Sequence, residues 1–136
     1  MIILSVDYGD VRTGIAVCDR MEILASPVGV INQSYEPKLI KEIAEIAKTK
    51  KAELIVVGLP KNMDGSEGER AEKCKAFALR LSEETGIKTE MQDERLTTVS
   101  AHRALSDNNV RGQKRKNVVD AVSAVMILED FLRKRK

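Results

Sequence analysis

The chain has 136 residues, of which 43% are hydrophobic and 32% are charged, a composition typical of a folded domain and not of a disordered chain. Aromatic residues make up only 3%, with no tryptophan, so a surface of aromatic side chains that stack on bases is not expected. No apolar segment approaches membrane length, and the opening MIILSV is too short for the apolar part of a signal peptide, so we expect neither a membrane span nor a signal peptide. We therefore expect a single domain, residues 1–136, that is cytoplasmic, has no membrane partner and keeps Cys18 and Cys74 as free thiols.

The formal net charge is only +2, but the charges are unevenly distributed. Residues 111–136 contain eight basic and three acidic residues, whereas the rest of the chain contains 15 basic and 18 acidic residues. Such an asymmetry is typical of contact with a polyanion. For the last four residues, RKRK, a solvated tail is an equally good explanation. For VRGQKRK at 110–116, the glycine and the flanking apolar sequence favour a mobile loop that contacts phosphate groups.

The first half of the chain is expected to form a meander of strands and then to alternate helix and strand. Strands joined by short turns are predicted at residues 2–7, 12–18 and 23–31. Pro27 would lie best at a sheet edge or a bulge. Apolar residues at helical spacing indicate a helix over 37–49, and the continuous apolar run at 52–58 indicates a strand buried on both faces.

The next predicted elements are a helix and a strand. Ser66 and Glu69 have the spacing of a capping box, which predicts a helix that begins there and ends near Gly86. Residues 87–91 are expected to form a strand, and the sequence DER lies just beyond its end.

Two helices complete the chain. Thr97 or Thr98 is expected to cap a helix that runs to about Leu105, and Asn117 is expected to cap the last helix. The resulting order, β-β-β-α-β-α-β-α-α, places the chain in the α/β class, with a five-stranded mixed sheet and helices on both faces.

Carboxylates occur at three positions that such a fold could bring together: Asp7, the pair Asp93 and Glu94, and Asp120. Sites in open sheets form at the carboxyl ends of strands, where Asp7 and the pair both fall. Clustered carboxylates repel one another unless a cation lies among them, and hard oxygen ligands without histidine or cysteine suit Mg²⁺ or Mn²⁺. One or two such ions can support hydrolysis of a phosphodiester by water.

Each acid also has a purely structural explanation. Asp7 could shape a turn, and the pair Asp93 and Glu94 could be a solvated charge cluster before a helix. Asp120 lies three residues after Asn117 and could complete a helix cap. The combination of all three positions with a basic stretch directly before Asp120 favours the functional explanation, although the residues alone do not choose between Asp93 and Glu94.

Four motifs now carry a family resemblance: VDYGDVRTGIAVCD, VVGLPKNMDGSEG, DERLTTVSAHRAL and RGQKRKNVVDAVSAVMILEDFL. In this order and spacing they resemble the YqgF/RuvX family, whose members are described as Holliday junction resolvases and as nucleases that mature the small-subunit ribosomal RNA precursor. The first motif alone is weak, because actin-like ATPases carry a similar hairpin, but the series of four is specific. The resemblance covers nearly the whole chain and implies a ribonuclease H-like fold.

The resemblance also implies roles for individual residues. Asp7, Glu94 and Asp120 would be the catalytic, metal-binding acids, with Asp93 as a further candidate ligand for Mg²⁺ or Mn²⁺. The strand near Gly58 ends in GLP, where related resolvases carry an acid, so the site is expected to depend on DER.

Other residues are expected to assist the acids. Gly9 and Gly14 would let the backbone turn tightly and approach the substrate. Positive side chains would bind the phosphates of a nucleic-acid backbone, and the candidates are Arg12, Arg111, Lys114, Arg115 and Lys116.

The expected partner is nucleic acid, either precursor ribosomal RNA, including ribosomal precursor particles, or branched DNA. A resolvase should be a homodimer, because two symmetric cuts need two sites, whereas a monomer fits a ribonuclease. A non-catalytic nucleic-acid-binding module is a separate alternative. An actin-like ATPase ranks last, because those proteins bind nucleotide between two domains and this chain has length for one.

Overall fold

The computed structural model describes the backbone of residues 1–94 and 113–135, and the side chains of 1–94 and 122–135. Its elements, in chain order, are β1 (Ile3–Asp7), β2 (Arg12–Cys18), β3 (Ala25–Asn32), α1 (Glu36–Lys50), β4 (Leu54–Leu59), α2 (Glu69–Thr85), β5 (Thr89–Asp93) and α4 (Gln113–Arg135). The helix predicted to end near Leu105 lies outside the described residues. The other predicted helices and strands are present, with ends that differ by a few residues.

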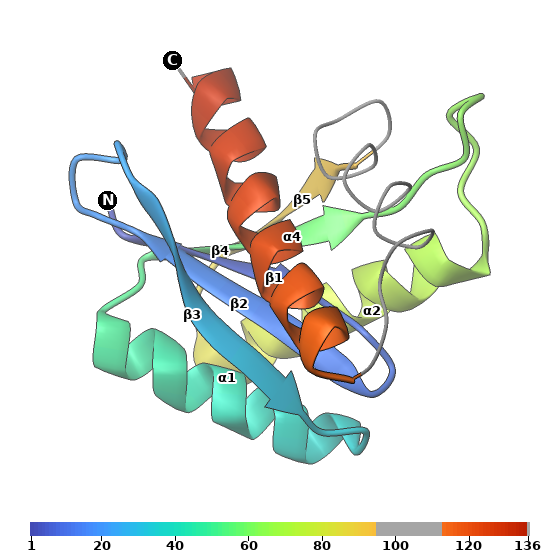
Figure 1. Ribbon diagram of the computed structural model, residues 1–136, viewed down its shortest axis with the longest axis horizontal. Helices are drawn as coiled ribbons and strands as arrows, with labels where there is room; N and C mark the ends of the chain where they lie inside the picture. The colour runs from blue at the N-terminus through green and yellow to red at the C-terminus, as the bar shows by residue number, and fades with distance from the viewer. Residues whose placement is uncertain (95–112, 136) are drawn as a thin grey trace.

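The strands form one mixed sheet in the order β3-β2-β1-β4-β5. The pairs β1–β2 and β2–β3 are antiparallel, whereas β1–β4 and β4–β5 are parallel. Helices α1 and α2 cover one face of the sheet and α4 crosses the other (Figure 1). The predicted five-stranded mixed sheet with helices on both faces is therefore confirmed.

The central strands β1 and β4 are buried along their whole length, as the apolar run at 52–58 predicts. Leu4 and Val6 point into the core beneath α1 and α2, whereas Ile3 points into the core beneath α4. This alternation follows from the two-residue period of a strand. Each fully buried aliphatic side chain contributes about 1.5–3 kcal/mol relative to exposure, so these two strands fix the position of the layers. Cys18 and Cys74 are free thiols, both buried.

Strand β3 is an edge strand with an irregular register. Ile15 of β2 pairs with Gly29, but the next residue, Ala16, pairs with Pro27, so one residue of β3 is bulged. Gly29 has φ of +152° at this bulge. This register confirms the expectation that Pro27 lies at an edge or bulge. Proline fits there because it has no N–H group to donate to an interior ladder.

The predicted capping box of α2 is wrong. The helix has Gly68 at its N-cap, with no side-chain cap hydrogen bond. Ser66 is engaged in the preceding loop, where its Oγ donates to Asp64 Oδ1 at 2.6 Å and accepts from Asn62 Nδ2 at 2.9 Å. Local turn hydrogen bonds of this kind compete with capping. The predicted end is confirmed: Gly86, with φ of +70°, is the C-cap.

The start of the last helix also differs from the prediction. Residues 113–116 are already helical, so Asn117 lies inside α4 and is not its cap. For the same reason Lys114, Arg115 and Lys116 lie on a helix and not in a mobile loop, whereas Arg111 lies outside the described residues. Glutamine, lysine and arginine all favour helix, which explains why the helix extends through this stretch. No described helix is long and apolar enough to span a bilayer.

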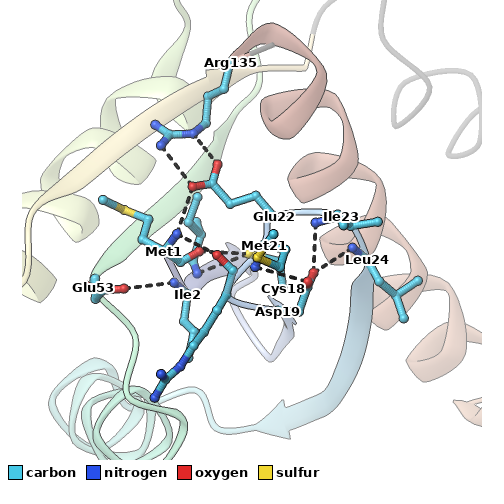
Figure 2. Close-up of polar contacts among 12 residues, drawn as sticks. Met1, Ile2, Cys18, Asp19, Met21, Glu22, Ile23, Leu24, Glu53 and Arg135 are labelled. Atoms are coloured by element: carbon cyan, nitrogen blue, oxygen red, sulfur yellow. Dashed lines mark hydrogen bonds and ion pairs between the residues drawn. The ribbon is translucent and has the colours of Figure 1, made fainter.

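Helix α4 runs antiparallel to β1, and polar contacts fix it at two levels. In the middle, the buried Ser5 Oγ donates to the carbonyl oxygen of Ala124 at 2.7 Å. At the amino-terminal end of β1, Arg135 Nε donates to Glu22 Oε1 at 2.7 Å, and the amino group of Met1 donates to Glu22 Oε2 at 2.9 Å (Figure 2). The carboxyl end of α4 is thus held beside the start of β1, and its amino-terminal part extends toward the end of β1.

The anchor of α4 at Glu22 predicts a specific dependence of stability on pH. Hydrogen bonds from Arg135 and then from the amino terminus lower the pKa of Glu22 from 4.5 to about 2. A lowered folded-state pKa stabilises the fold above the unfolded-state value, and this contribution is lost as pH falls toward about 2. Glu22→Gln should therefore lower the free energy of unfolding at pH 7 by about 1 kcal/mol, a value reduced by solvent screening.

Urea unfolding of both proteins at a series of pH values would measure this. The difference should shrink as pH falls from 4.5 toward 2. Glu45→Gln, at an exposed position of α1, is the matched control and should show no such difference. A constant difference between wild type and Glu22→Gln over this range would contradict the assignment.

Candidate active site

The site lies where three parallel strands end next to one another. Asp7 is the last residue of β1, and the register that pairs Val6 with Val57 places it beside Gly58 of β4. On the other side of β4, Gly58 pairs with Gln92 of β5. Glu94 follows β5 directly, and its backbone N–H donates to Leu59 O at 3.0 Å. Asp7 and Glu94 therefore lie at the carboxyl ends of strands that flank a common neighbour.

Strand alternation separates the two adjacent acids of DER. Met91 packs against the core beneath α1 and α2, so Asp93, two residues later, is on that same face. Glu94 is on the opposite face, which is the face of Ser5 and Asp7 and is covered by α4. The strand itself runs from Thr89 to Asp93 and not over 87–91, because its register is set by pairing with β4.

Gly58 leaves the space that the Glu94 side chain occupies. A Cβ atom built on Gly58 would lie 2.7 Å from Ile127 Cδ1, 3.0 Å from Glu94 Cδ and 3.2 Å from Glu94 Oε1. Any side chain here would have to displace either the carboxyl group or a fully buried isoleucine of α4. The glycine in GLP thus leaves room for the carboxyl group of Glu94 to lie over β4.

Asp7 and Glu94 share one pocket of about 220 Å³. Both carboxylates are largely withdrawn from water, with exposed fractions of 8% and 5%. The pocket is lined by Asp7, Tyr8, Gly9, Arg12, Gly58, Pro60, Arg70, Cys74 and Glu94. Asp93 is not among these described lining residues. Two negative groups and two arginines therefore border a single small cavity.

The turn between β1 and β2 forms one wall of the pocket. A Cβ atom on Gly9 would lie 2.1 Å from the carbonyl oxygen of Arg12, so only glycine fits this turn. Gly9 N–H also donates to Thr13 Oγ1 at 3.3 Å. Gly14 pairs with Asp7 in the antiparallel ladder. Gly9 thus fits a tight turn that places Arg12 at the pocket, whereas the approach of Gly9 and Gly14 to a substrate stays a prediction.

Arg70 is a pocket residue that the sequence did not reveal. It lies in the first turn of α2, where its Nη1 donates to Asp10 Oδ1 at 2.9 Å and its Nη2 donates to the carbonyl oxygen of Tyr8. Its guanidinium carbon lies 5.0 Å from the centre of the Tyr8 ring, which stacks on Phe77 at 4.0 Å. Burial, reinforced by the negative charge of Glu36, raises the pKa of Tyr8, so the phenol stays neutral. No local motif marks Arg70, because its partners lie about sixty residues earlier in the chain.

Asp120 lies on the part of α4 whose backbone is described but whose side chains are not. It is four residues before Ala124, the partner of Ser5, which corresponds to about 6 Å along a helix. Asp7 is two residues beyond Ser5, about 6.6 Å along a strand. Because α4 and β1 are antiparallel, both steps lead toward the same end of the sheet. As the eighth residue of the described helix, Asp120 is also too far inside α4 to serve as its cap.

The acids present fit a divalent cation, although the described residues do not complete a ligand set. Within the described part of the chain, no group of three or more acidic, histidine or cysteine side chains is placed to hold a metal ion. Asp7 and Glu94 supply two buried carboxylates to one cavity. Such hard oxygen ligands are the ones that Mg²⁺ and Mn²⁺ prefer. Asp120 would be the third acid.

Comparison with known proteins connects this chain to nucleases. The family model of RuvX, described as a Holliday junction resolvase, matches residues 1–134. A protein of Clostridioides difficile named "Putative pre-16S rRNA nuclease" is 44% identical over 130 residues, which cover 96% of this chain and 92% of the relative. One of the same name from Agathobacter rectalis is 40% identical over 135 residues, covering 97% of this chain and 94% of the relative.

Solved structures of Holliday junction resolvases have a fold similar to that of this chain. Thermus thermophilus RuvC in complex with a Holliday junction has a TM-score of 0.61 at 14% identity, covering 100% of this chain and 97% of that one. The fowlpox virus resolvase bound to junction DNA has a TM-score of 0.60 at 10% identity, with 99% of both chains covered. The fold is thus that of ribonuclease H-like resolvases, as the motif series implies. With the family model matched over nearly its whole length, the chain belongs to the RuvX family of nucleases.

Proposed function

We propose that this protein is a metal-dependent endonuclease that hydrolyses phosphodiester bonds in precursor 16S ribosomal RNA. The observation that carries the proposal is the pair of buried carboxylates, Asp7 and Glu94, which border one pocket together with Arg12. Preference for RNA is supported by the relatives at 44% and 40% identity, both named for pre-16S rRNA.

Asp7, Glu94 and Asp120 would hold Mg²⁺ or Mn²⁺, with Asp93 outside this set. Such an ion, when bound, supplies Lewis-acid polarisation of the phosphodiester and favours ionisation of the attacking water. Asp7 comes from β1 and Glu94 from the end of β5, so the rigid sheet fixes both ligands relative to each other. Rigid positioning of this kind matters because small displacements of reacting groups cost large factors in rate.

The residues around the acids prepare the pocket for a phosphodiester. Two buried carboxylates repel a phosphate unless positive charge is present. Arg12 supplies a guanidinium at the pocket, and guanidinium groups match phosphate oxygens with paired hydrogen bonds. Lys114, Arg115 and Lys116, carried on α4 before Asp120, would add contacts to the backbone of a longer substrate, which contribute affinity without sequence information.

A Holliday junction resolvase is the second candidate, and the description of the matching family model favours it. Both activities would use the same pocket, so substrate and assembly must separate them. Resolution of a four-way junction needs two sites in a symmetric dimer. Molar mass in solution, measured with and without junction DNA, would show whether such a dimer exists.

The acids can be tested directly by cleavage of a labelled pre-16S RNA fragment and of a four-way DNA junction, each with Mg²⁺ and with chelator. Asp7→Asn and Glu94→Gln should each reduce cleavage at least 100-fold (about 2.7 kcal/mol of barrier), because each removes one of the charges that hold the cation. Asp93→Asn, the adjacent acid on the other face, is the matched control and should cleave within a few-fold of wild type.

Thermal unfolding of all three variants should show intact folds. Cleavage by Asp7→Asn at the wild-type rate would contradict the assignment of Asp7 to the active site. Cleavage of only the junction would transfer the proposal to the resolvase.

The space above Gly58 gives a second test. In Gly58→Ala, the new methyl group must displace Glu94 or Ile127, so we expect destabilisation of about 1–3 kcal/mol from overpacking and a loss of cleavage larger than thermal unfolding explains. In Gly68→Ala, no atom lies within 4 Å of the new methyl group, so cleavage should persist. Equal cleavage rates for the two variants at a temperature where both are folded would refute the role of this space.

The basic part of α4 gives a third test, read in binding and not in cleavage. Replacing Lys114, Arg115 and Lys116 by glutamine should weaken RNA binding and reduce the slope of log K against log salt by up to about 2.1–2.7, because each lost phosphate contact removes about 0.7–0.9. Glutamine at Arg133 and Lys134, at the other end of the same helix, is the control. If both sets of variants keep the wild-type slope, the residues at 114–116 are solvated charges only.

A further inference from the structure

We propose that Arg70 is a phosphate-binding residue of this pocket and contacts the nucleic-acid backbone next to the bond that is cut. The proposal rests on the nuclease function proposed above and adds a residue from α2, an element that no motif connects with substrate. Arg70 borders the same cavity as Asp7 and Glu94.

The guanidinium of Arg70 is held in place before any substrate arrives. One nitrogen donates to the carbonyl oxygen of Tyr8 and another to Asp10 Oδ1. The Tyr8 ring lies beneath it and is itself fixed by a nearly parallel stack, with 6° between its plane and that of Phe77. A side chain fixed in this way loses little conformational entropy on binding, which favours affinity.

Arg70 also has hydrogen-bonding capacity left over. A guanidinium carries five N–H donors, and among the described residues only Tyr8 and Asp10 accept hydrogen bonds from it. Its side chain is 36% exposed, and that of Asp10 is 69% exposed. An ion pair so open to water is weak, so Asp10 orients the guanidinium without cancelling its attraction for a phosphate.

The competing explanation is that Arg70 only ties α2 to the turn between β1 and β2. The two explanations differ in the dependence of binding on salt. A residue that neutralises a phosphate releases a counterion, so its loss lowers the slope of log K against log salt, whereas loss of a structural tie changes affinity without changing the slope.

The experiment measures binding of a fluorescein-labelled RNA stem-loop by anisotropy, in chelator, at several salt concentrations. All proteins carry Asp7→Asn, which prevents cleavage and removes one of the negative charges of the pocket. Into this parent we introduce Arg70→Met, Arg70→Lys, Asp10→Asn and, as matched control, Arg80→Met. Arg80 is on the same helix and is also ion-paired, its Nε donating to Glu36 Oε1 at 2.6 Å, but it does not border the pocket.

We expect Arg70→Met to weaken binding about tenfold and to lower the slope by about 0.7–0.9. Arg70→Lys should recover much of the slope, because the charge is kept. Asp10→Asn should retain the parent slope, because the guanidinium is kept, and Arg80→Met should match the parent.

Three results would overturn the proposal. If Arg70→Met keeps the parent slope, or if Asp10→Asn weakens binding as much as Arg70→Met, then Arg70 is a structural tie only. If the parent does not bind RNA, Arg70 has no phosphate to contact. The cleavage assay on wild type decides the nuclease function independently, so failure of the two proposals can be told apart. If thermal melting shows that Arg70→Met is not folded, the comparison of Arg70→Lys with Asp10→Asn still distinguishes a phosphate-binding residue from a structural tie.

Discussion

Gly58 lies on β4, between the strand that carries Asp7 and the strand that leads to Glu94, and the space above it is filled by the Glu94 carboxyl group and by Ile127. Contacts as short as 2.7 Å to an added Cβ mean that neither neighbour could stay in place beside a larger residue. The glycine therefore does two things at once. It lets α4 approach the sheet, and it leaves room for an acid from the end of β5 on the face where Asp7 lies.

The close approach of α4 to the sheet is held at two levels. Ser5 and Ala124 join the helix to β1 at mid-length, and Arg135 and Glu22 hold its far end. These two levels fix the direction of the helix, which is why the backbone position of Asp120 and the end of β1 lie toward the same end of the sheet. A helix tilted away from β1 would move Ile127 off Gly58 and would change the surroundings of Glu94 as well.

The order of elements and their layers follow from the hydrophobic pattern of the sequence, which is clear in the continuous apolar run of β4 and in the helical spacing of apolar residues in α1. The predicted helix starts are wrong where a polar residue can either cap a helix or take part in another local structure. Ser66 is hydrogen-bonded within its loop instead of capping α2, and Asn117 lies inside a helix that basic residues with high helix propensity extend. The residues alone left Asp93 and Glu94 open and the family resemblance favoured Glu94, whereas the register of β5 against β4 was needed to see that Glu94 shares a face with Asp7. Arg70 could not be predicted at all, because its partners Tyr8 and Asp10 are distant in sequence and only the packing of α2 on the sheet brings them near.

The charges around the pocket also explain why several elements must contribute to it. Carboxylates alone would favour a cation and repel a phosphodiester, and guanidinium groups alone would bind a phosphate without a means of activating water. Asp7, Glu94, Arg12 and Arg70 come from β1, from the residue after β5, from β2 and from α2, and all four border about 220 Å³. Asp7 and Glu94 are only 8% and 5% exposed, so attraction between these carboxylates and a positive charge beside them is stronger than at the open surface. Cation and phosphate binding should then reinforce each other, because each offsets the repulsion that the other would meet alone.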